Sequence, residues 1–414
     1  MVNSSAAAPE PVPPAPLQET MARATALLTG AWGGAVRLAL TQPLRPAAAR
    51  TAVLRCRVEA APEGARAPAS VVVKHYRGAP ERPFDPADTT PFGPAGRFAN
   101  EWCGLVMLHE TAGAAPFAPA PYAAELEVGL LVMEDLGDDP SLAQVLQGQD
   151  PQAAEAALVA FAEGLGRVHG ATVGRRASYQ ALRREAAPRG QQADERVARV
   201  ARELEEQLTR FRQACDAAGV PLPAAAEAEL GQVAREVAEP GPFDALVVSD
   251  TCPDNNRWRP AAGVRFFDLE AAGFDNAMME AAYFWLPFPT CWCVNRLPEA
   301  LPPRLEVVYR EALAASCPAA GDEATFARAL VAACLAWQVR TVGGDLVRTL
   351  EKDSQWGIAT MRQRLPLRAA NIARVTERHG QFPALGAHAA ALAERLRSRW
   401  GEAAEMPLYP AFAG

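Results

Sequence analysis

Apolar and polar residues alternate with a period of two over the first part of the chain. The alternation covers residues 36–44 and 51–59, and a run of valines within 70–76 then leads to Lys74. Period-two patterns and β-branched runs are typical of strands. The pattern therefore predicts an antiparallel pair over 36–44 and 51–59, followed by a third strand over 70–76.

Helical spacing of apolar residues appears on both sides of these strands. It predicts a short helix over 21–29 and a longer one over 98–111, which carries Glu101 near its start. The Pro- and Asp-rich segment 78–97 predicts a long loop. Two further strand pieces are predicted within 126–133.

The second part of the chain is mostly helical in pattern. Helix formers dominate residues 141–240 and again 272–400, and one strand-like segment, 246–270, separates them. Within it we expect a strand over 246–248 and a hairpin that pairs 257–258 with 264–267, whose second strand ends in Asp268. The pattern predicts an α+β fold with a small β-rich lobe, a hinge near 134–140 and a larger, mostly helical lobe.

Composition and charge narrow the class of protein. Of the 414 residues, half are hydrophobic and a fifth are charged, and the formal net charge is −7, which argues against nonspecific nucleic-acid binding. The longest apolar run, near 329–337, is shorter than a membrane span and predicts a buried helix. We expect no membrane partner and no secretory signal, and the oligomeric state is unreadable.

Cysteines lack a framework spacing. The chain has eight of them, and their scatter predicts reduced thiols and a cytoplasmic location. Cys291 and Cys293 could hold a soft metal, but no His or further Cys lies near them in sequence, so buried packing is favoured.

Isolated acids on short loops carry the candidate chemistry. Asp250 and Asn255 lie five residues apart around a turn, and Asp268 ends the next hairpin. Phosphoryl transfer needs a carboxylate for the attacking hydroxyl, and an amide and a second carboxylate for Mg²⁺. The alternative is a polar hairpin with Asx turns. Glu270 is either a water-mediated metal contact or a turn cap.

Charged residues of the first lobe suit a nucleotide. A strand lysine, Lys74, held by a helix glutamate, Glu101, would aim an ammonium at the α- and β-phosphates. A solvated lysine is the alternative, and Glu110 lies on the same helix. The connector that includes Glu134 and Leu136 would offer backbone groups to the adenine edge.

Five segments in this order resemble the aminoglycoside phosphotransferase and choline kinase family. They are VVVK at 71–74, NEW around Glu101, LVMEDL at 131–136, DTCPDN at 250–255 and FFDLE at 266–270. The resemblance covers roughly residues 36–290 and implies a protein-kinase-like fold with two lobes.

The resemblance also implies roles and boundaries. Residues 1–20 would be a disordered lead, 21–137 a nucleotide-binding lobe and 138–414 a helical lobe with the catalytic loop and acceptor site. The implied roles fall on the following residues: Asp250 for catalysis, Asn255 and Asp268 for Mg²⁺, Lys74 and Glu101 for the phosphates, and Arg50 and Thr51 in the phosphate loop.

Three departures from the family pattern leave two functions open. Val248-Ser249 replaces the His-Gly before the catalytic Asp, and the loop 45–51 has no glycine. In the same loop, Pro46 fixes one φ and removes one backbone donor. The first function is phosphorylation of a hydroxyl on a small-molecule acceptor by ATP, or alternatively GTP, with Mg²⁺. The second is a degenerate kinase-like protein that binds nucleotide or ligand without transfer.

Two further groups have structural interpretations. His169 ends an amphipathic pattern and is expected to pack or to cap a helix. Four aromatic residues lie close together in an apolar segment: Phe284, Trp285, Phe288 and Trp292. Such a segment is typical of a core, and the alternative is that these residues line an acceptor pocket.

Overall fold

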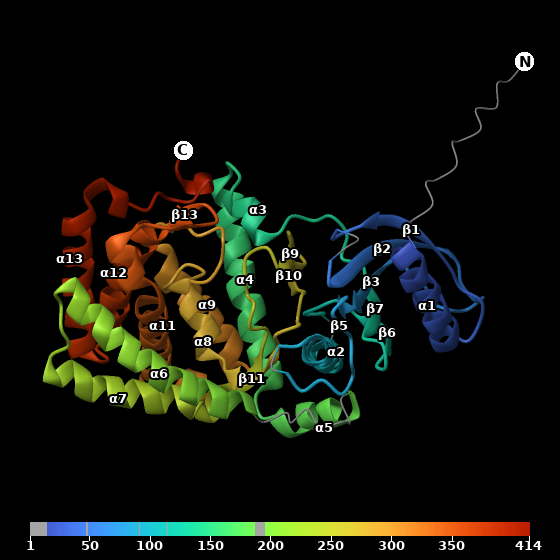
Figure 1. Cartoon of the computed structure of the whole chain (residues 1–414), viewed down its shortest axis with the longest axis horizontal. Coiled ribbons are helices and arrows are strands. Elements are labelled where there is room, and N and C mark those ends of the chain that lie inside the picture. The colour runs from blue at the N-terminus through green and yellow to red at the C-terminus, as the bar shows by residue number, and fades with distance from the viewer. Residues whose placement is uncertain (1–14, 47–48, 91, 114, 187–194) are drawn as a thin grey trace, which may run out of the picture. The chain divides into compact units, whose positions relative to one another are not determined.

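The computed structural model describes residues 15–46, 49–90, 92–113, 115–186 and 195–414 (Figure 1). The chain divides into two compact units. Unit 1 comprises Met1–Trp102, Pro119–Asp135 and Ala186–Gln191, and unit 2 comprises Cys103–Ala118, Leu136–Glu185 and Gln192–Gly414. The passage from Asp135 to Leu136 falls inside the hinge predicted near 134–140.

Unit 1 is built on an antiparallel sheet. Among the described residues the sheet has five strands in the order β1-β2-β3-β7-β6. They are β1 (Arg37–Pro43), β2 (Thr51–Ala60), β3 (Ser70–Tyr76), β6 (Pro121–Glu125) and β7 (Leu130–Glu134). The predicted antiparallel pair and the third strand are confirmed.

A helix covers the core of this sheet. In α1 (Ala15–Trp32) the buried residues Leu17, Ala24 and Leu28 follow helical spacing and pack in one cluster with strand residues such as Val73. The helix starts at Ala15, so the lead that we assigned to 1–20 is wrong for its last six residues. Residues 1–14 lie outside the described part of the chain.

The segment after β3 is more ordered than its composition suggests. A small strand pair, β4 (Gly78–Ala79) with β5 (Arg82–Pro83), interrupts the loop predicted over 78–97. Gly78 has φ +73°, and an added Cβ there would lie 2.4 Å from the carbonyl oxygen of Arg82. Helix α2 (Pro94–Thr111) begins four residues earlier than predicted.

Unit 2 is mostly helical. Its longer helices are α4 (Pro151–Thr172), α5 (Arg176–Ala186), α6 (Glu195–Ala218), α7 (Ala224–Ala238), α9 (Leu301–Ala314), α11 (Glu323–Glu351), α12 (Met361–His379) and α13 (Pro383–Trp400), and its short ones are α3 (Leu142–Leu146), α8 (Met278–Ala281) and α10 (Pro318–Gly321). Single 3-10 turns cover 241–243, 282–284, 401–404 and 410–412.

The apolar run near 329–337 lies inside α11. This helix is long and apolar enough to cross a membrane by composition, but 72% of its most apolar window is buried inside the protein. The prediction of a buried helix is confirmed.

In the described part of unit 2, three short antiparallel strand pairs lie among these helices. The hairpin predicted around 257–267 is confirmed as β9 (Asn256–Arg259) with β10 (Gly263–Phe266). Strand β8 (Asp244–Val247) pairs with β11 (Gly273–Asn276), and β12 (Gln355–Trp356) pairs with β13 (Ala359–Thr360). The structure therefore has the predicted α+β composition, with a small β-rich unit and a larger, mostly helical unit.

Candidate functional site

Lys74 and Glu101 form a buried ion pair in unit 1. Lys74 Nζ lies 2.6 Å from Glu101 Oε2, and their side chains are 4% and 0% exposed. The hydroxyl of Tyr76 also donates to Glu101 Oε2. β3 supplies Lys74 and Tyr76 on one face because side chains two residues apart in a strand point to the same side. Glu110, the alternative partner on α2, is exposed.

A buried ion pair needs an explanation other than stability. Removing two charges from water costs several kcal/mol per ion, and their attraction often only offsets that cost. Protein kinases use a lysine of the third strand paired with a glutamate of the next helix to position phosphates. Lys74 of β3 and Glu101 of α2 have this arrangement.

The expected phosphate loop joins β1 to β2. Arg50 is exposed, and Thr51 is buried at the start of β2, opposite Tyr76 in the register. The Gly78 N–H donates to the carbonyl of Arg50, which ties the end of the loop to the sheet. Residues 47–48 of this loop lie outside the described residues, so the role of Arg50 and Thr51 stays a prediction.

Glu134 uses its backbone N–H and its side chain in hydrogen bonds within unit 1. Its backbone N–H donates to the carbonyl of Ala120, and its Oε2 accepts from the Ala120 N–H at 3.1 Å. Those bonds leave its N–H occupied, so an adenine contact would have to use another group. Leu136 is half-buried and belongs to unit 2. Adenine binding by these two residues stays a prediction.

Asp250 lies on the loop after β8 in unit 2. Asn255 Nδ2 donates to the Asp250 carbonyl at 3.0 Å and closes the loop around the turn. The neighbouring Asn256 is fully buried and ties the loop to α3, because its Oδ1 accepts from the Leu142 N–H at 2.9 Å. Asn255 therefore remains half-exposed while Asn256 has the structural role.

The electrostatics of the loop favour a bound cation. Although Asp250 is exposed overall, desolvation raises the pKa of its carboxyl, and the negative charge of Asp268 raises it further. Asn255 lowers it by hydrogen bonding, while Asp254 and Glu270 raise it. Several carboxylates thus act on one position, and a cation there would relieve their repulsion.

The residues fit Mg²⁺ with few protein ligands. Among the described residues no group of three or more His, Cys, Asp or Glu side chains is arranged to hold a metal. Mg²⁺, however, keeps several waters and needs one or two carboxylates beside the substrate phosphates. Asp268, in the left-handed region with φ +64°, and the amide of Asn255 supply that minimum.

Sequence reasoning missed Glu280, which holds the backbone before Asp250. This buried α8 carboxylate accepts from the Val248 N–H at 3.3 Å and from the Ser249 N–H. It also bonds His169 Nε2 at 2.9 Å. The signal was available: a lone acid inside the apolar run 277–288 has to be paired if it is buried.

His169 has the packing role expected for it. Its ring is fully buried between Glu280 and Tyr309, whose hydroxyl lies 2.8 Å from Nδ1. Burial and the charge of Glu280 raise the pKa of Tyr309 well above its ordinary value. Glu280, His169 and Tyr309 therefore form a buried network that supports the backbone before Asp250.

The cysteine prediction is wrong for one pair. Cys252, two residues after Asp250, forms a disulfide with Cys291 in unit 2. The pairing escaped sequence reasoning because the two cysteines are 39 residues apart and no spacing rule connects them. The other described cysteines are free and buried, and burial raises the pKa of Cys293 to about 12.

The predicted aromatic core is confirmed for three of four residues. Phe284, Trp285 and Phe288 are at most 2% exposed, whereas Trp292 is 38% exposed. The alternative of an acceptor pocket therefore survives for Trp292.

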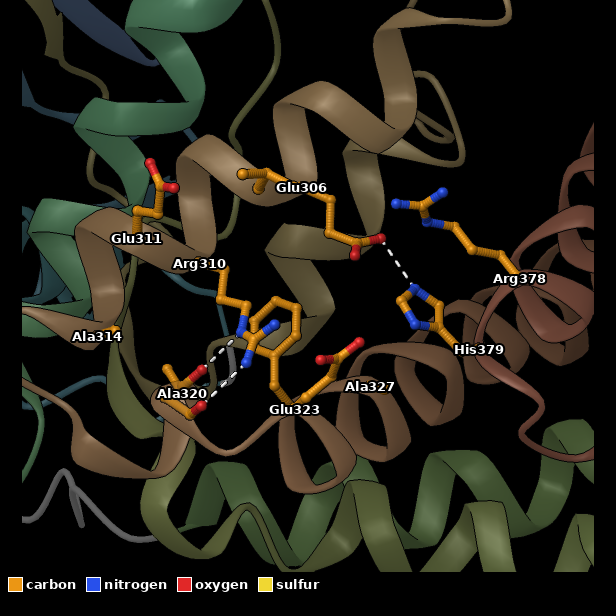
Figure 2. Close-up of a pocket in the computed structure, with 12 residues that line it drawn as sticks. Glu306, Arg310, Glu311, Ala314, Ala320, Glu323, Ala327, Arg378 and His379 are labelled. Atoms are coloured by element: carbon orange, nitrogen blue, oxygen red, sulfur yellow. Dashed lines mark hydrogen bonds and ion pairs between the residues drawn. The ribbon is translucent and has the colours of Figure 1, made fainter.

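A separate cavity of about 600 Å³ lies between α9, α10, α11 and α12. Figure 2 shows Glu306 pointing toward His379 across it, with Oε2 3.0 Å from Nε2, while Arg310 turns to the carbonyls of Ala320 and Gly321. None of the predicted catalytic residues lines this cavity.

Comparisons with known proteins leave the family open. No protein-family model and no curated protein matches the chain. Solved structures do match. A choline/ethanolamine kinase family protein from Mesorhizobium loti is 12% identical, with TM-score 0.43, over 92% of this chain and 99% of that chain.

Two other matches are similar in quality. An aminoglycoside phosphotransferase from Alicyclobacillus acidocaldarius is 13% identical, with TM-score 0.43, over 94% of this chain and 98% of that chain. Amicoumacin kinase hAmiN, in complex with AMP-PNP, Ca²⁺ and Ami, is 12% identical, with TM-score 0.44, over 87% and 92%. Because these TM-scores are below 0.5, the structural similarity does not assign a function to this chain.

Proposed function

We propose that this chain is an ATP-dependent phosphotransferase that phosphorylates a hydroxyl of a small-molecule acceptor. The observation that carries the proposal is the buried Lys74–Glu101 ion pair, whose cost to stability points to a task in binding phosphates. Lys74 would hold the α- and β-phosphates, and Glu101 would fix the direction of its ammonium.

The acids of unit 2 supply the remaining roles. Asp250 would orient the acceptor hydroxyl and accept its proton, a task that suits a carboxyl whose pKa is raised by desolvation. Asn255 and Asp268 would hold Mg²⁺, which when bound neutralises charge on the β- and γ-phosphates. The chain's own contribution is mainly positioning and charge complementarity.

The proposed nucleotide is ATP, with GTP as the alternative, and the proposed location is the cytoplasm. Disulfides are rare in a reducing cytoplasm, so the Cys252–Cys291 link does not favour that location. A cytoplasmic protein would hold these cysteines as thiols for part of its lifetime.

Calorimetric titration with Mg·ATP tests the proposal. We expect micromolar binding by the parent, weakening of at least about tenfold in Asp268→Ala, and thermal stabilisation by ATP that EDTA removes. Asp250→Ala should retain most nucleotide binding and lose turnover. Undiminished turnover in Asp250→Ala would remove Asp250 from the mechanism.

A second candidate is a degenerate kinase-like protein that binds nucleotide without transfer. Ser249 favours it, because the residue before Asp250 adopts the left-handed region, φ +70°, without being glycine. ATP stabilisation that is indifferent to EDTA would support this candidate over the enzyme.

A further inference from the structure

Three exposed apolar side chains gather beside the loop of Asp250. Trp292 is 38% exposed, Trp356 51% and Ile358 39%. We call Trp292, Trp356 and Ile358 the aromatic platform. The Ile358 N–H donates to the Trp292 carbonyl at 2.9 Å, which brings the β12–β13 hairpin against the segment of Trp292.

The contact between the two segments is close and fixed. Gly357 has φ +59°, and an added Cβ there would lie 1.9 Å from the Trp292 carbonyl oxygen, so only glycine fits the turn. Arg364, buried under both segments, donates to the Cys291 carbonyl at 2.9 Å and to the Trp356 carbonyl at 2.7 Å. Arg364 therefore joins the two segments that carry the platform.

Both indole N–H groups are used inside the protein. Trp292 Nε1 donates to Asp254 Oδ2 at 2.8 Å, and Trp356 Nε1 donates to the Thr290 carbonyl at 2.9 Å. Indole N–H groups are the polar part of these side chains. What remains exposed is the apolar ring surface, extended by the aliphatic side chain of Ile358.

The platform is attached to the catalytic loop at two points. The indole of Trp292 bonds Asp254, four residues after Asp250, and the preceding residue, Cys291, is joined covalently to Cys252. A side chain fixed in this way keeps its position relative to the Asp250 carboxylate, as a substrate-positioning group must.

We propose that the aromatic platform binds a flat aromatic or apolar ring of the acceptor and so presents the acceptor's hydroxyl to Asp250. The inference rests on the proposed phosphotransferase function and names its substrate class, a hydroxylated compound with an aromatic or flat apolar ring. Ring stacking on indole is the interaction that such surfaces provide.

Binding of defined alcohols tests the platform. The probes are tryptophol and 2-phenylethanol, and choline and kanamycin are the cationic comparisons. Saturation-transfer NMR detects the binding of each compound in the presence of Mg²⁺ and a nonhydrolysable ATP analogue. We expect the aromatic alcohols to bind the parent and to bind Trp356→Ala about fivefold or more weakly. Trp356→Phe should restore most of the binding, because it keeps a ring.

The matched control is Val307→Ala, which removes another exposed apolar side chain, 45% exposed, at the separate cavity. It should leave binding of the alcohols unchanged. Because Trp356 is half-exposed, its variants are expected to fold, and circular dichroism checks this.

The outcomes separate the platform from the phosphotransferase. Binding of choline or kanamycin that is indifferent to Trp356→Ala, or absence of aromatic-alcohol binding by the parent, overturns the platform even where Mg·ATP binds. Conversely, Trp356-dependent binding of aromatic alcohols by a protein that binds no Mg·ATP upholds the ring-binding site and overturns the phosphotransferase.

Discussion

The carboxylate of Glu280 accepts a hydrogen bond from the backbone N–H of Ser249, the residue that precedes Asp250. A side chain of α8 thereby sets the path of the loop on which the proposed catalytic carboxylate sits.

Glu280→Gln should slow turnover without much effect on Mg·ATP affinity. The amide that replaces one carboxylate oxygen would face a donor, and an unpaired buried N–H costs about 1–3 kcal/mol. We expect a loss of kcat of at least about tenfold, since loop misplacement acts on the reacting geometry. Steady-state kinetics and calorimetry measure the two effects.

Glu306→Gln is the control for this substitution. Glu306 is also buried and accepts from Trp285 Nε1 at 2.7 Å, but it lies at the separate cavity. The Glu306→Gln variant should be less stable than the parent protein and should have the same kcat. Equal losses of kcat in both variants would reduce Glu280 to a purely structural group.

Ser249→Gly should stabilise unit 2. Ser249 has φ +70°, a conformation that costs an L-residue about 1–2 kcal/mol and glycine little. The gain is reduced because glycine also loses more entropy on folding. Urea unfolding measures it, with Ala261→Gly, φ +65° in the exposed β9–β10 turn, as the comparison. Destabilisation by Ser249→Gly alone would show that the serine side chain contributes more than its strain costs.

Mild acid should destabilise the protein through His75. Burial, and after it the positive charge of Arg77, lower the pKa of His75 to about 4, and its Nδ1 lies 2.9 Å from the hydroxyl of Thr20 on α1. Because the unfolded state takes up the proton first, stability should fall as the pH drops from about 6.5 toward 4 and level off below that. At about 1.4 kcal/mol per pH unit the loss approaches about 3 kcal/mol.

His75→Gln should remove most of this pH dependence, measured as urea midpoints between pH 7 and 4. His109→Gln, which replaces an exposed histidine of α2, should leave the dependence as it is in the parent. A parent curve that is flat over this range would contradict the assignment.

The acid limb of activity should report Asp250. Desolvation and then Asp268 raise the pKa of its carboxyl, and Glu270 adds to the rise. If Asp250 must be ionised, kcat/KM should fall at a pH above the ordinary 3.8 of a free aspartate. Glu270→Gln should move the fall to lower pH, and Glu299→Gln, which does not act on Asp250, should not. The profile of slow ATP hydrolysis suffices for this measurement before the acceptor is known.

Breaking the Cys252–Cys291 disulfide should destabilise unit 2. A cross-link between residues 39 apart restricts the unfolded chain by about 4 kcal/mol in the chain-entropy description. Dithiothreitol should therefore lower the melting temperature of the parent. The double variant Cys252→Ala/Cys291→Ala should start lower and be insensitive to the reductant; a sensitive double variant would point to another cysteine pair.

Local patterns predicted most of the fold. The valine run before Lys74 gave a strand with the observed bounds of β3, and alternation gave β1, β2 and the β9–β10 hairpin, because these residues alternate between a buried and an exposed face. The start of α1 was missed because proline-rich surroundings hide its first turn. Strand β11 was missed because four residues are too few for a periodic signal.

The parts of the site that depend on distant partners could not be predicted. Lys74 and Glu101 were identified because both sit on periodic elements that follow one another. Glu280 and Trp356, however, act through contacts with residues tens of positions away, and nothing local distinguishes Trp356 from a surface residue.

The Cys252–Cys291 disulfide also determines whether proteolytic cleavage between these two cysteines yields separate fragments. The turn between β9 and β10, Pro260–Ala262, is exposed and lies inside the segment enclosed by Cys252 and Cys291. Exposed turns of small residues are preferred sites of cleavage. A cut there would leave Asp250 and Asp268 on different polypeptides that remain covalently joined, so the nicked protein would separate into two fragments only after reduction.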